Sequence, residues 1–485
     1  MQIPPQFIEH YQKLIPEGEW EEFLRLCNFP LPKSVRVNTL KIPVTEFKKR
    51  AEQNDWQLKP IPWCQEGFWI DRENRDVPLG KTLEYFAGLF YVQEAASLLP
   101  VEILDPQPNE VVLDLCAAPG SKTTQIAAKM QNRGVVVANE YNSQRAGSLI
   151  FNLEQQGCLN TLITRLDGKR IGDYLPETFD KVLVDAPCSA EGVARKDPLY
   201  FKMWSENLIQ RLAGEQKQLL KSAWRSLKPG GVLVYSTCTY APEENEAVIQ
   251  ELLEQFSKEV GVEEIGLKGV KFLSATSEWQ GKKFDQVITR GIRMIPNFHN
   301  TEGFFVVKLK KHENTRTLEH HNNKTLKQRT SLRETILKDR KKLEYLGFLK
   351  ERFDIRPTIF EDFLFTEIEN VVWIKPEAYL TFKEIISIQK AGICLGKIYG
   401  LELKLTTMVA QIFGQFAAKN RINLSQNQAE ELARGKDVIL ENNQYFKQEQ
   451  GSKLVFFEEF CLGVSLLQAE GYLKNQIERK FRLAS

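Results

Sequence analysis

VVLDLCAAPGSKTT, residues 111–124, joins a short β-branched run to a turn of small residues that leads into a helix. A buried strand followed by such a turn is typical of a parallel sheet with crossover helices. The turn lets the backbone approach a ligand, and the helix start offers free N–H groups to a carboxylate. A Walker A loop is not indicated, because only Gly120 precedes Lys122 and the required glycine spacing is absent. The stretch therefore predicts a ligand-binding turn at the edge of a sheet.

The same pattern of strands and helices continues to about residue 238. Apolar β-branched runs alternate with longer amphipathic stretches, which predicts a doubly wound, Rossmann-like α/β fold. A helix is expected over 201–227, because apolar residues recur there at helical spacing before a Lys-Pro-Gly-Gly stop. One further edge strand is expected at 303–311. The expected strands before it are 111–115, 134–140, 161–167, 181–187 and 231–238.

Acidic residues end three successive strands of this expected sheet: Glu140, Asp167 and Asp185. Ligands of open α/β sheets bind beyond the carboxyl ends of the strands, where an acid can hold ribose hydroxyl groups. Glu140 has that position. Asp167 or Asp185 could accept a hydrogen bond from an adenine amino group, and either could also lie beside a reacting base. A single acid could simply cap the next helix, but three in succession favour a binding role.

Two cysteines are expected at the same edge of the sheet. Cys188 follows the fourth strand, and Cys238 ends the fifth. Carbon 5 of cytosine is a poor nucleophile, but attack of a thiolate on carbon 6 makes it reactive toward a methyl donor. The chemistry also needs a hydrogen-bond partner near ring nitrogen 3, which Asp185 could supply, and a base that removes the carbon 5 proton. The two thiols therefore favour covalent methyl transfer over the alternative that each is a small buried side chain.

The other cysteines indicate neither a metal site nor a disulfide framework. The eight cysteines contain no C-x-x-C pair, and the five histidines have no metal-ligand spacing. We therefore expect no metal and reduced thiols in a cytoplasmic protein. Residues 1–6 lack a signal-peptide pattern, and no run approaches the length of a membrane span. The cysteines expected to be buried hydrophobic side chains are Cys27, Cys64, Cys158, Cys394 and Cys461.

Overall charge gives no indication of a nucleic-acid partner. The 485 residues, enough for two to four domains, include 65 basic and 63 acidic side chains and carry a net charge of +2. From Lys308 to Arg352, however, fourteen Lys or Arg face six Asp or Glu, an excess of eight. Residues 312–332 have almost no large apolar groups, which indicates a solvated linker. The basic run could contact RNA or could be a solvated surface.

Together the motifs resemble the Sun/Nop family of RNA 5-methylcytosine methyltransferases. The resemblance rests on DLCAAPGSKT (114–123), DAPCSAEGVARKDP (185–198) and VYSTCTYAPEENE (234–246), with shorter matches at 34–40, 91–97 and 301–305. It implies S-adenosylmethionine as the cofactor, Cys238 as the nucleophile and Cys188 as an aid to product release, although the two roles could be exchanged. Asp185 would act on the base as well as on the cofactor. The implied cofactor-binding residues are Cys116, Ala117, Ala118, Pro119, Gly120, Ser121, Lys122, Glu140, Asp167 and Asp185.

The resemblance is greatest to a bacterial subgroup that acts on small-subunit ribosomal RNA. Ser121 stands where many family members have a second glycine, and the GSKTT form is similar to this subgroup. Enzymes that methylate carbon 5 in DNA use the Pro-Cys cysteine as nucleophile, so Cys238 favours RNA. The subgroup implies four regions: an RNA-positioning domain at 1–105, a methyltransferase domain at 106–311, a basic linker at 312–340, and an accessory region at 341–485 with a PUA-like RNA-binding module, matched loosely at 471–475.

The expected substrate is structured RNA, 16S ribosomal RNA before transfer RNA, with a target base that must be flipped out to reach the thiol. Arg36, Asn38 and Lys41 would face RNA or solvent, and Arg195 and Lys196 would meet a phosphate. Two other functions stay open: a methyltransferase for an amine or small molecule, and a non-catalytic ribosome-assembly factor. A monomer is expected, although no residue determines the oligomeric state.

Overall fold

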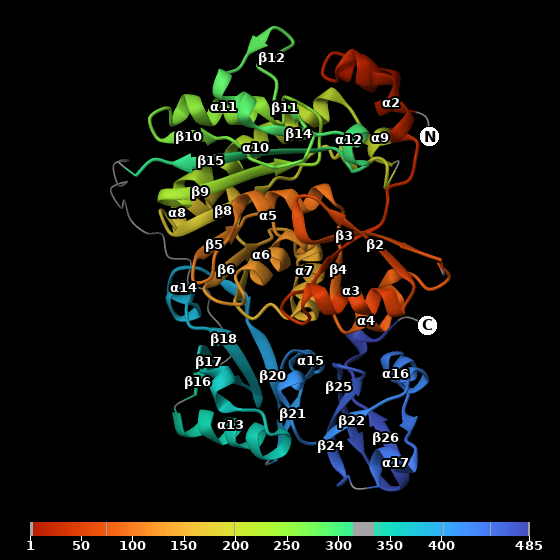
Figure 1. Ribbon diagram of the computed structural model, residues 1–485. Helices are drawn as coiled ribbons and strands as arrows, with labels where there is room; N and C mark the ends of the chain where they lie inside the picture. Colours follow the sequence, from red (N-terminus) through yellow and green to blue (C-terminus); the bar gives the residue numbers. More distant parts are fainter. Residues whose placement is uncertain are drawn as a thin grey trace.

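The computed structural model describes residues 3–73, 75–197, 199–313, 334–337, 339–400, 402–446 and 448–483. Figure 1 shows a central sheet with the N-terminal elements, red to orange, along its right side and the C-terminal elements, cyan to blue, below it. Most of the expected linker 312–340 falls on 314–333 and 338, which lie outside the described residues. Within the described ranges, no helix has the length and apolar character needed to cross a membrane.

The N-terminal part consists of helices and a four-stranded antiparallel sheet in the order β2-β3-β1-β4. Phe47 on the inner face of α3 packs with Trp56, Phe68 and Phe90 of the sheet, because the apolar residues of α3 fall on one side. The elements are α1 (Pro5–Tyr11), α2 (Glu17–Cys27), β1 (Ser34–Val37), α3 (Val44–Gln53), β2 (Trp56–Ile61), β3 (Cys64–Arg72), α4 (Leu83–Phe86) and β4 (Phe90–Val92).

The central sheet has ten strands, and its middle strands are parallel. Their order is β11-β14-β15-β9-β8-β5-β6-β7-β19, and β10 pairs with β15. The carboxyl ends of β5 to β9 consequently meet at one edge. The strands are β5 (Val111–Asp114), β6 (Val135–Asn139), β7 (Thr161–Thr164), β8 (Phe179–Asp185), β9 (Leu227–Thr237), β10 (Val260–Glu263), β11 (Leu273–Ser274), β14 (Ile292–Met294), β15 (Phe304–Lys311) and β19 (Ile388–Ala391), beside a hairpin of β12 (Glu278–Trp279) and β13 (Lys282–Lys283).

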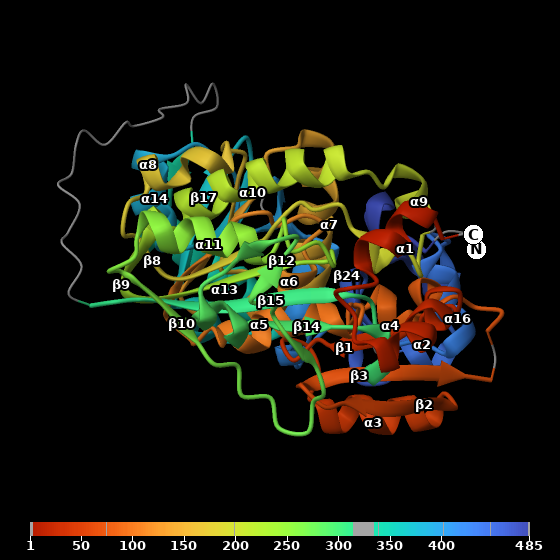
Figure 2. The ribbon, with the colours of Figure 1, turned by 90° about the horizontal axis from the view of Figure 1, so that it is seen from above.

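Helices cover both faces of this sheet, as Figures 1 and 2 show, which confirms the Rossmann-like prediction. On one face, Leu99 and Ile126 pack with Val112 and Val136; on the other, Trp224 belongs to a separate core. The first face carries α5 (Leu99–Leu104), α6 (Ser121–Lys129) and α7 (Ser143–Gln156); the second carries α8 (Ile171–Tyr174), α10 (Glu206–Ser226) and α11 (Glu246–Gln255). Two short helices, α9 (Leu199–Met203) and α12 (Pro296–His299), pack with the N-terminal helices.

Three details of the central domain, two in the sheet and one in a helix, differ from the sequence prediction. The strand expected at the edge, β15, is internal, because β9 pairs with one side of it and the short β14 and β10 pair with the other. The single helix expected over 201–227 is two helices, since Ser205 caps α10 by accepting the Leu208 N–H at 3.2 Å. Finally, β19 arrives from the C-terminal part and pairs antiparallel with β7. Short strands with distant partners leave little periodicity to detect.

The C-terminal part contains two five-stranded sheets, β16-β17-β18-β20-β21 and β22-β24-β25-β26-β23. The strands β24 and β25 form a hairpin that turns at Glu458 (φ +50°). The elements are β16 (Thr335–Ile336), α13 (Asp339–Phe353), β17 (Phe363–Ile368), β18 (Val371–Pro376), α14 (Tyr379–Ile385), β20 (Ile393–Tyr399), β21 (Glu402–Leu405), α15 (Thr407–Phe413), β22 (Arg421–Asn423), α16 (Gln426–Ala433), β23 (Val438–Ile439), α17 (Asn442–Tyr445), β24 (Gly451–Phe457), β25 (Phe460–Leu467) and β26 (Tyr472–Asn475).

Candidate active site

The two cysteines lie together at the carboxyl edge of the central sheet. The Sγ atoms of Cys188 and Cys238 are 3.1 Å apart, and the Cys238 backbone N–H donates to Cys188 Sγ at 3.3 Å. Hydrogen bonding to Cys238, together with burial, raises the pKa of Cys188 well above its usual value. Cys188 is therefore a protonated thiol that can donate a hydrogen bond to its neighbour. Both residues are partly exposed, so a substrate can approach them.

An ion pair lies beside the thiols. Lys122 Nζ donates to Asp185 Oδ2 at 2.7 Å and to Ser97 Oγ at 3.1 Å, and Ser236 Oγ donates to Asp185 Oδ1 at 2.8 Å. Burial lowers the pKa of Lys122, but the attraction of Asp185 and Cys238 outweighs it and raises the pKa overall. Lys122 is consequently a buried cation that fixes the carboxylate at the end of β8.

The turn of residues 116–122 connects β5 to α6. Gly120 has φ +108°, a left-handed conformation that favours glycine, and a Cβ there would lie 3.1 Å from Leu149 Cδ1. Because α6 starts at Ser121, its free N–H groups and its positive end lie at the edge that carries the cysteines. A carboxylate fits this position.

Two acids near this turn have a carboxyl oxygen without a hydrogen bond. Glu140, after β6, accepts the Asn142 N–H through Oε1 at 2.9 Å, while its buried Oε2 has no hydrogen-bond partner within the described residues and forms only a 3.5 Å ion pair with the exposed Arg145. Asp114, at the end of β5, accepts the Thr123 hydroxyl at 2.6 Å and has an unpaired Oδ1. Burial raises the pKa of Asp114 to about 7. A buried acceptor without a partner fits the hydroxyl donors of a ribose.

Asp167, unlike Glu140 and Asp185, caps the helical turn that follows it. Its Oδ1 accepts the Lys169 N–H at 3.1 Å and caps a short 3₁₀ turn, Gly168–Arg170. The residue is half-buried at the carboxyl end of β7. Capping occupies one carboxyl oxygen and leaves the other available to a ligand.

Buried carboxyls tie the two cysteine loops together. Ser189, next to Cys188, donates its hydroxyl to Thr239 Oγ1 at 3.0 Å, and its N–H to Glu244 Oε2 at 3.1 Å. Thr239, next to Cys238, donates to Glu191. Burial, and then the charge of Glu191, raises the pKa of Glu244 to about 8. The network fixes the separation of the two thiols.

Gly192 joins the same loops to β15. Its N–H donates to the Cys238 carbonyl at 2.9 Å, and its carbonyl accepts the Gly303 N–H at 3.2 Å. A Cβ on Gly192 would lie 2.2 Å from the Gly303 oxygen and 2.8 Å from the Cys238 oxygen. Glycine is therefore required at position 192. Through its two hydrogen bonds, Gly192 holds the segment before β15 next to Cys238.

Comparison with known proteins identifies the family of the chain. Residues 101–310 match the family model of 16S rRNA methyltransferase RsmB/F, and residues 3–95 match that of the N-terminal domain of 16S rRNA methyltransferase RsmF. Ribosomal RNA small subunit methyltransferase F of Vibrio parahaemolyticus is 39% identical over 90% of this chain and 88% of its own length. The Vibrio campbellii protein of the same name is 38% identical over 99% and 97%.

This chain belongs to the RsmB/F family of 16S rRNA methyltransferases.

Within this family the chain groups with RsmF, by its N-terminal match and its near full-length similarity. Membership confirms the expected RNA (cytosine-5)-methyltransferase activity on 16S rRNA, in a family that depends on S-adenosylmethionine. A solved structure, a methyltransferase homolog protein from Pyrococcus horikoshii, is 34% identical with a TM-score of 0.54. It aligns over 64% of this chain and 100% of its own, so its fold corresponds to part of this methyltransferase.

Of the three residues expected to face RNA or solvent, Arg36 and Asn38 are buried and Lys41 is half-buried in the RsmB/F methyltransferase. Arg36 donates to the Ser121 carbonyl and to Thr124 Oγ1, each at 2.8 Å. Asn38 is 2% exposed. Lys41 donates to the backbone carbonyl of Ala87 in the N-terminal part and to that of Gln155 in α7. These side chains hold the N-terminal part against α6 and α7. Their partners come from distant segments, which the sequence pattern alone does not reveal.

Arg195 also differs from its expected phosphate-binding role. It is 7% exposed, and its guanidinium donates to the carbonyls of Phe29 (3.1 Å) and Thr301 (2.9 Å) and to Asn300 Oδ1 (2.6 Å). Four of the five guanidinium N–H donors are thus taken by the protein, including one to the Pro30 carbonyl at 3.3 Å, which leaves at most one for a phosphate. Lys196 is exposed, so its phosphate contact stays a prediction.

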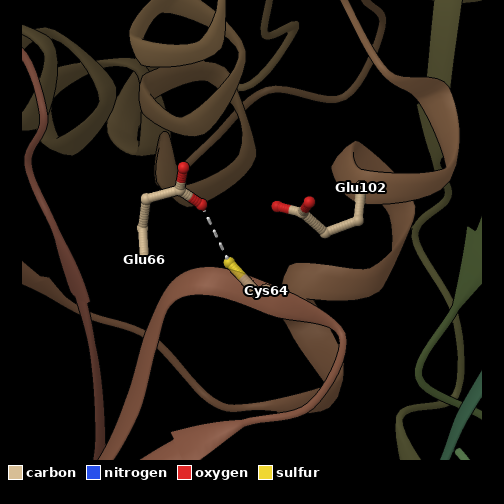
Figure 3. A group of neighbouring side chains, drawn as sticks. All are labelled: Cys64, Glu66 and Glu102. Atoms are coloured by element: carbon tan, nitrogen blue, oxygen red, sulfur yellow. Dashed lines mark hydrogen bonds between the residues drawn. The ribbon is translucent and has the colours of Figure 1, made fainter. Parts of the chain in front are cut away.

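Cys64 lies in a buried cluster away from the two catalytic candidates. Its thiol donates to Glu66 Oε2 at 3.5 Å, and Glu102 faces the pair from the other side (Figure 3). This is the one group of potential metal ligands found within the described ranges. Lys129 Nζ is 2.8 Å from Glu102, however, and burial raises the pKa of the thiol strongly. The protonated thiol carries no charge, and the Lys129 ammonium already offsets the charge of the Glu102 carboxylate. Of the other cysteines expected inside, Cys27, Cys158 and Cys461 are buried and Cys394 is half-buried.

Four further residues near the site were not predicted from the sequence: Ser97, Ser236, Glu94 and Glu302. Glu94 Oε1 accepts the Glu302 N–H and its Oε2 accepts the Ser97 N–H, each at 3.1 Å. All four belong to segments that carry the family resemblance. The acidic residues at 94 and 302, which lie within segments that match the family, could have pointed to these positions.

Proposed function

We propose that the chain transfers a methyl group from S-adenosylmethionine to carbon 5 of a cytosine in 16S ribosomal RNA through a covalent bond to Cys238. The 3.1 Å contact between the sulfurs of Cys188 and Cys238, beside the Lys122–Asp185 ion pair, carries this proposal. A methyltransferase for an amine or a small molecule needs no thiol at this position.

Cys238 supplies the nucleophile in this mechanism. Its thiolate adds to carbon 6 of the ring, Asp185 as a carboxylic acid would donate a hydrogen bond to ring nitrogen 3, and Lys122 would offset the negative charge that develops on the ring. Carbon 5 then takes the methyl group, which S-adenosylmethionine supplies when bound. Once carbon 5 has lost its proton, the carbon 6–sulfur bond breaks. Cys188, as a protonated thiol, donates a hydrogen bond to the departing Cys238 thiolate.

The residues beside this centre fit the cofactor. The free N–H groups at the start of α6 suit its carboxylate, and the Oε2 of Glu140, which accepts no hydrogen bond from the described residues, suits a ribose hydroxyl. Asp167 would accept a hydrogen bond from the adenine amino group. Asp185 would lie between the cofactor and the base. The assignment of 116–122 to the cofactor rests on the same placement.

RNA contacts would come from the other regions. We assign RNA positioning to 1–105, catalysis to 106–311 and a PUA-like module to the accessory region 341–485, joined by the basic linker 312–340. The five-stranded sheet of β22 to β26 supports such a module, as it is a separate antiparallel unit apart from its β22–β24 pairing. The protein would act as a cytoplasmic monomer on structured RNA.

Methyl transfer from labelled S-adenosylmethionine tests the proposal. The wild-type protein should label 16S rRNA at cytosine carbon 5, Cys238→Ala should not, and Cys188→Ala should accumulate a covalent protein–RNA adduct. A matched control is Cys158→Ala, a buried cysteine away from the thiol pair, which should keep the activity. Normal methylation by Cys238→Ala would refute the covalent mechanism. Labelling of transfer RNA in preference to 16S rRNA would reassign the substrate.

A further inference from the structure

Glu302 is a buried acid that the mechanism above does not use. It lies just before β15, at the edge where Cys238 follows β9, and Phe305 of β15 pairs with Thr237 of β9. The Gly303–Gly192–Cys238 hydrogen bonds hold its backbone beside the nucleophile. Only 5% of the Glu302 surface is exposed.

The carboxylate of Glu302 has no partner. Its Oε1 is fully buried without a hydrogen bond, and none of the ion pairs or hydrogen bonds of the described residues involves its side chain. The neighbouring carboxyl, Glu94, is by contrast occupied by two backbone N–H groups. A buried carboxyl that nothing in the protein satisfies is unusual, and it indicates a group reserved for a ligand or a proton.

Charged groups around Glu302 connect it to the active site. Burial and then Glu94 raise its pKa to about 8, while Lys196, Lys122 and Arg195 act in the opposite direction. Burial, and then the charges of Cys238, Asp197, Cys188 and Glu302, raise the pKa of Tyr200, so Glu302 and the two cysteines act on the same side chain. A carboxyl whose pKa is near the working pH is suited to accept a proton.

We propose that Glu302 is the base that removes the proton from carbon 5 of the cytosine after methyl transfer. This rests on the proposed function, since it requires the Cys238 adduct. The Glu302 carboxylate takes the carbon 5 proton, the electrons of that C–H bond form the carbon 5–carbon 6 double bond, and the carbon 6–sulfur bond breaks to return the Cys238 thiolate. The carboxylic acid then loses its proton to water.

The other acids and thiols of the site are less suited to this step. Asp185 is held by Lys122 and Ser236, and Glu94 by two backbone donors. Cys188 is a protonated thiol, which donates rather than accepts. Glu302 is the carboxyl left with free lone pairs next to the cysteine loops.

The test uses full-length protein and 16S rRNA labelled with tritium at cytosine carbon 5, in single turnovers with S-adenosylmethionine. Glu302→Gln should transfer the methyl group within about 3-fold of the wild-type rate but release tritium about 100-fold or more slowly, the range of a lost general base. A methylated protein–RNA adduct should accumulate. Glu302→Asp, which keeps a carboxylate, should release tritium faster than Glu302→Gln.

Tritium release by Glu302→Gln at the wild-type rate would overturn the proposal, and so would a loss of methyl transfer before the adduct forms. Equal loss in Glu302→Asp and Glu302→Gln would also overturn it. The exposed Glu278→Gln is the matched control and should behave as wild type. Failure of the proposed function is distinguishable, because Cys238→Ala would then methylate RNA.

Discussion

Cys188 and Cys238 leave the ends of neighbouring parallel strands, β8 and β9, and their sulfur atoms lie 3.1 Å apart. This separation leaves no room for a water molecule between the two thiols. We therefore expect hydrogen peroxide to link them, with two thiol protons and two electrons going to reduce peroxide to water. Activity should fall and should return with dithiothreitol. Peptide mapping should find residues 188 and 238 joined; irreversible loss without that linked pair would contradict the expectation.

Lys122→Met should reduce methyl transfer about 100-fold or more, because Asp185 loses its ion-pair partner and the reacting ring loses a nearby cation. Rates of methyl transfer in single turnovers measure the effect. Lys129→Met is the matched control: it removes a cation from the same helix that pairs with Glu102 instead. Similar losses in both variants would mean that α6 is merely destabilised.

Gly192→Ala should abolish most activity, since its Cβ would lie 2.2 Å from the Gly303 oxygen and push β15 away from Cys238. We expect a stability loss of about 1–3 kcal/mol, typical of overpacking. Gly214→Ala is the control, because nothing lies within 4 Å of a Cβ at that position of α10. Urea unfolding and adduct formation distinguish the two variants, and an active Gly192→Ala protein would show that the contact can relax.

Glu140→Gln should weaken S-adenosylmethionine binding about 10-fold, since a neutral amide is a poorer acceptor for ribose hydroxyls than a carboxylate. Calorimetric titration of the free enzyme measures this affinity. The exposed Glu52→Gln should bind like wild type. Unchanged affinity in Glu140→Gln would remove Glu140 from the cofactor site.

Glu302 should make stability fall as pH rises. Its pKa, raised to about 8 by burial and by Glu94, exceeds the ordinary value of 4.5. Between these values the folded protein binds more protons than the unfolded chain, so the free energy of unfolding decreases with pH. From pH 5 to pH 9, wild type should lose about 1–3 kcal/mol more than Glu302→Gln. Urea unfolding at both pH values tests this, and an identical decrease in the variant would assign the effect elsewhere.

The sequence predicted the parts of the site that depend on local pattern. Strands that alternate with helices form a parallel sheet, and a parallel sheet brings the carboxyl ends of its strands to one edge. That rule predicts from the sequence that Cys188, Cys238 and Asp185 lie together, and Gly120 indicates the turn before α6. Each of these residues follows directly from the strand or turn beside it.

Burial and pairing were decided by the tertiary structure. Arg36 and Arg195 have the positive charge of RNA-binding residues, yet both donate to backbone carbonyls of distant segments. Glu94 and Glu302 are far apart along the chain and become neighbours only when β15 pairs with β9. The local pattern of residues predicts the sheet, its carboxyl edge and the two thiols that follow its strands. Which charged groups face the site depends on contacts between distant segments, and local periodicity does not encode those contacts.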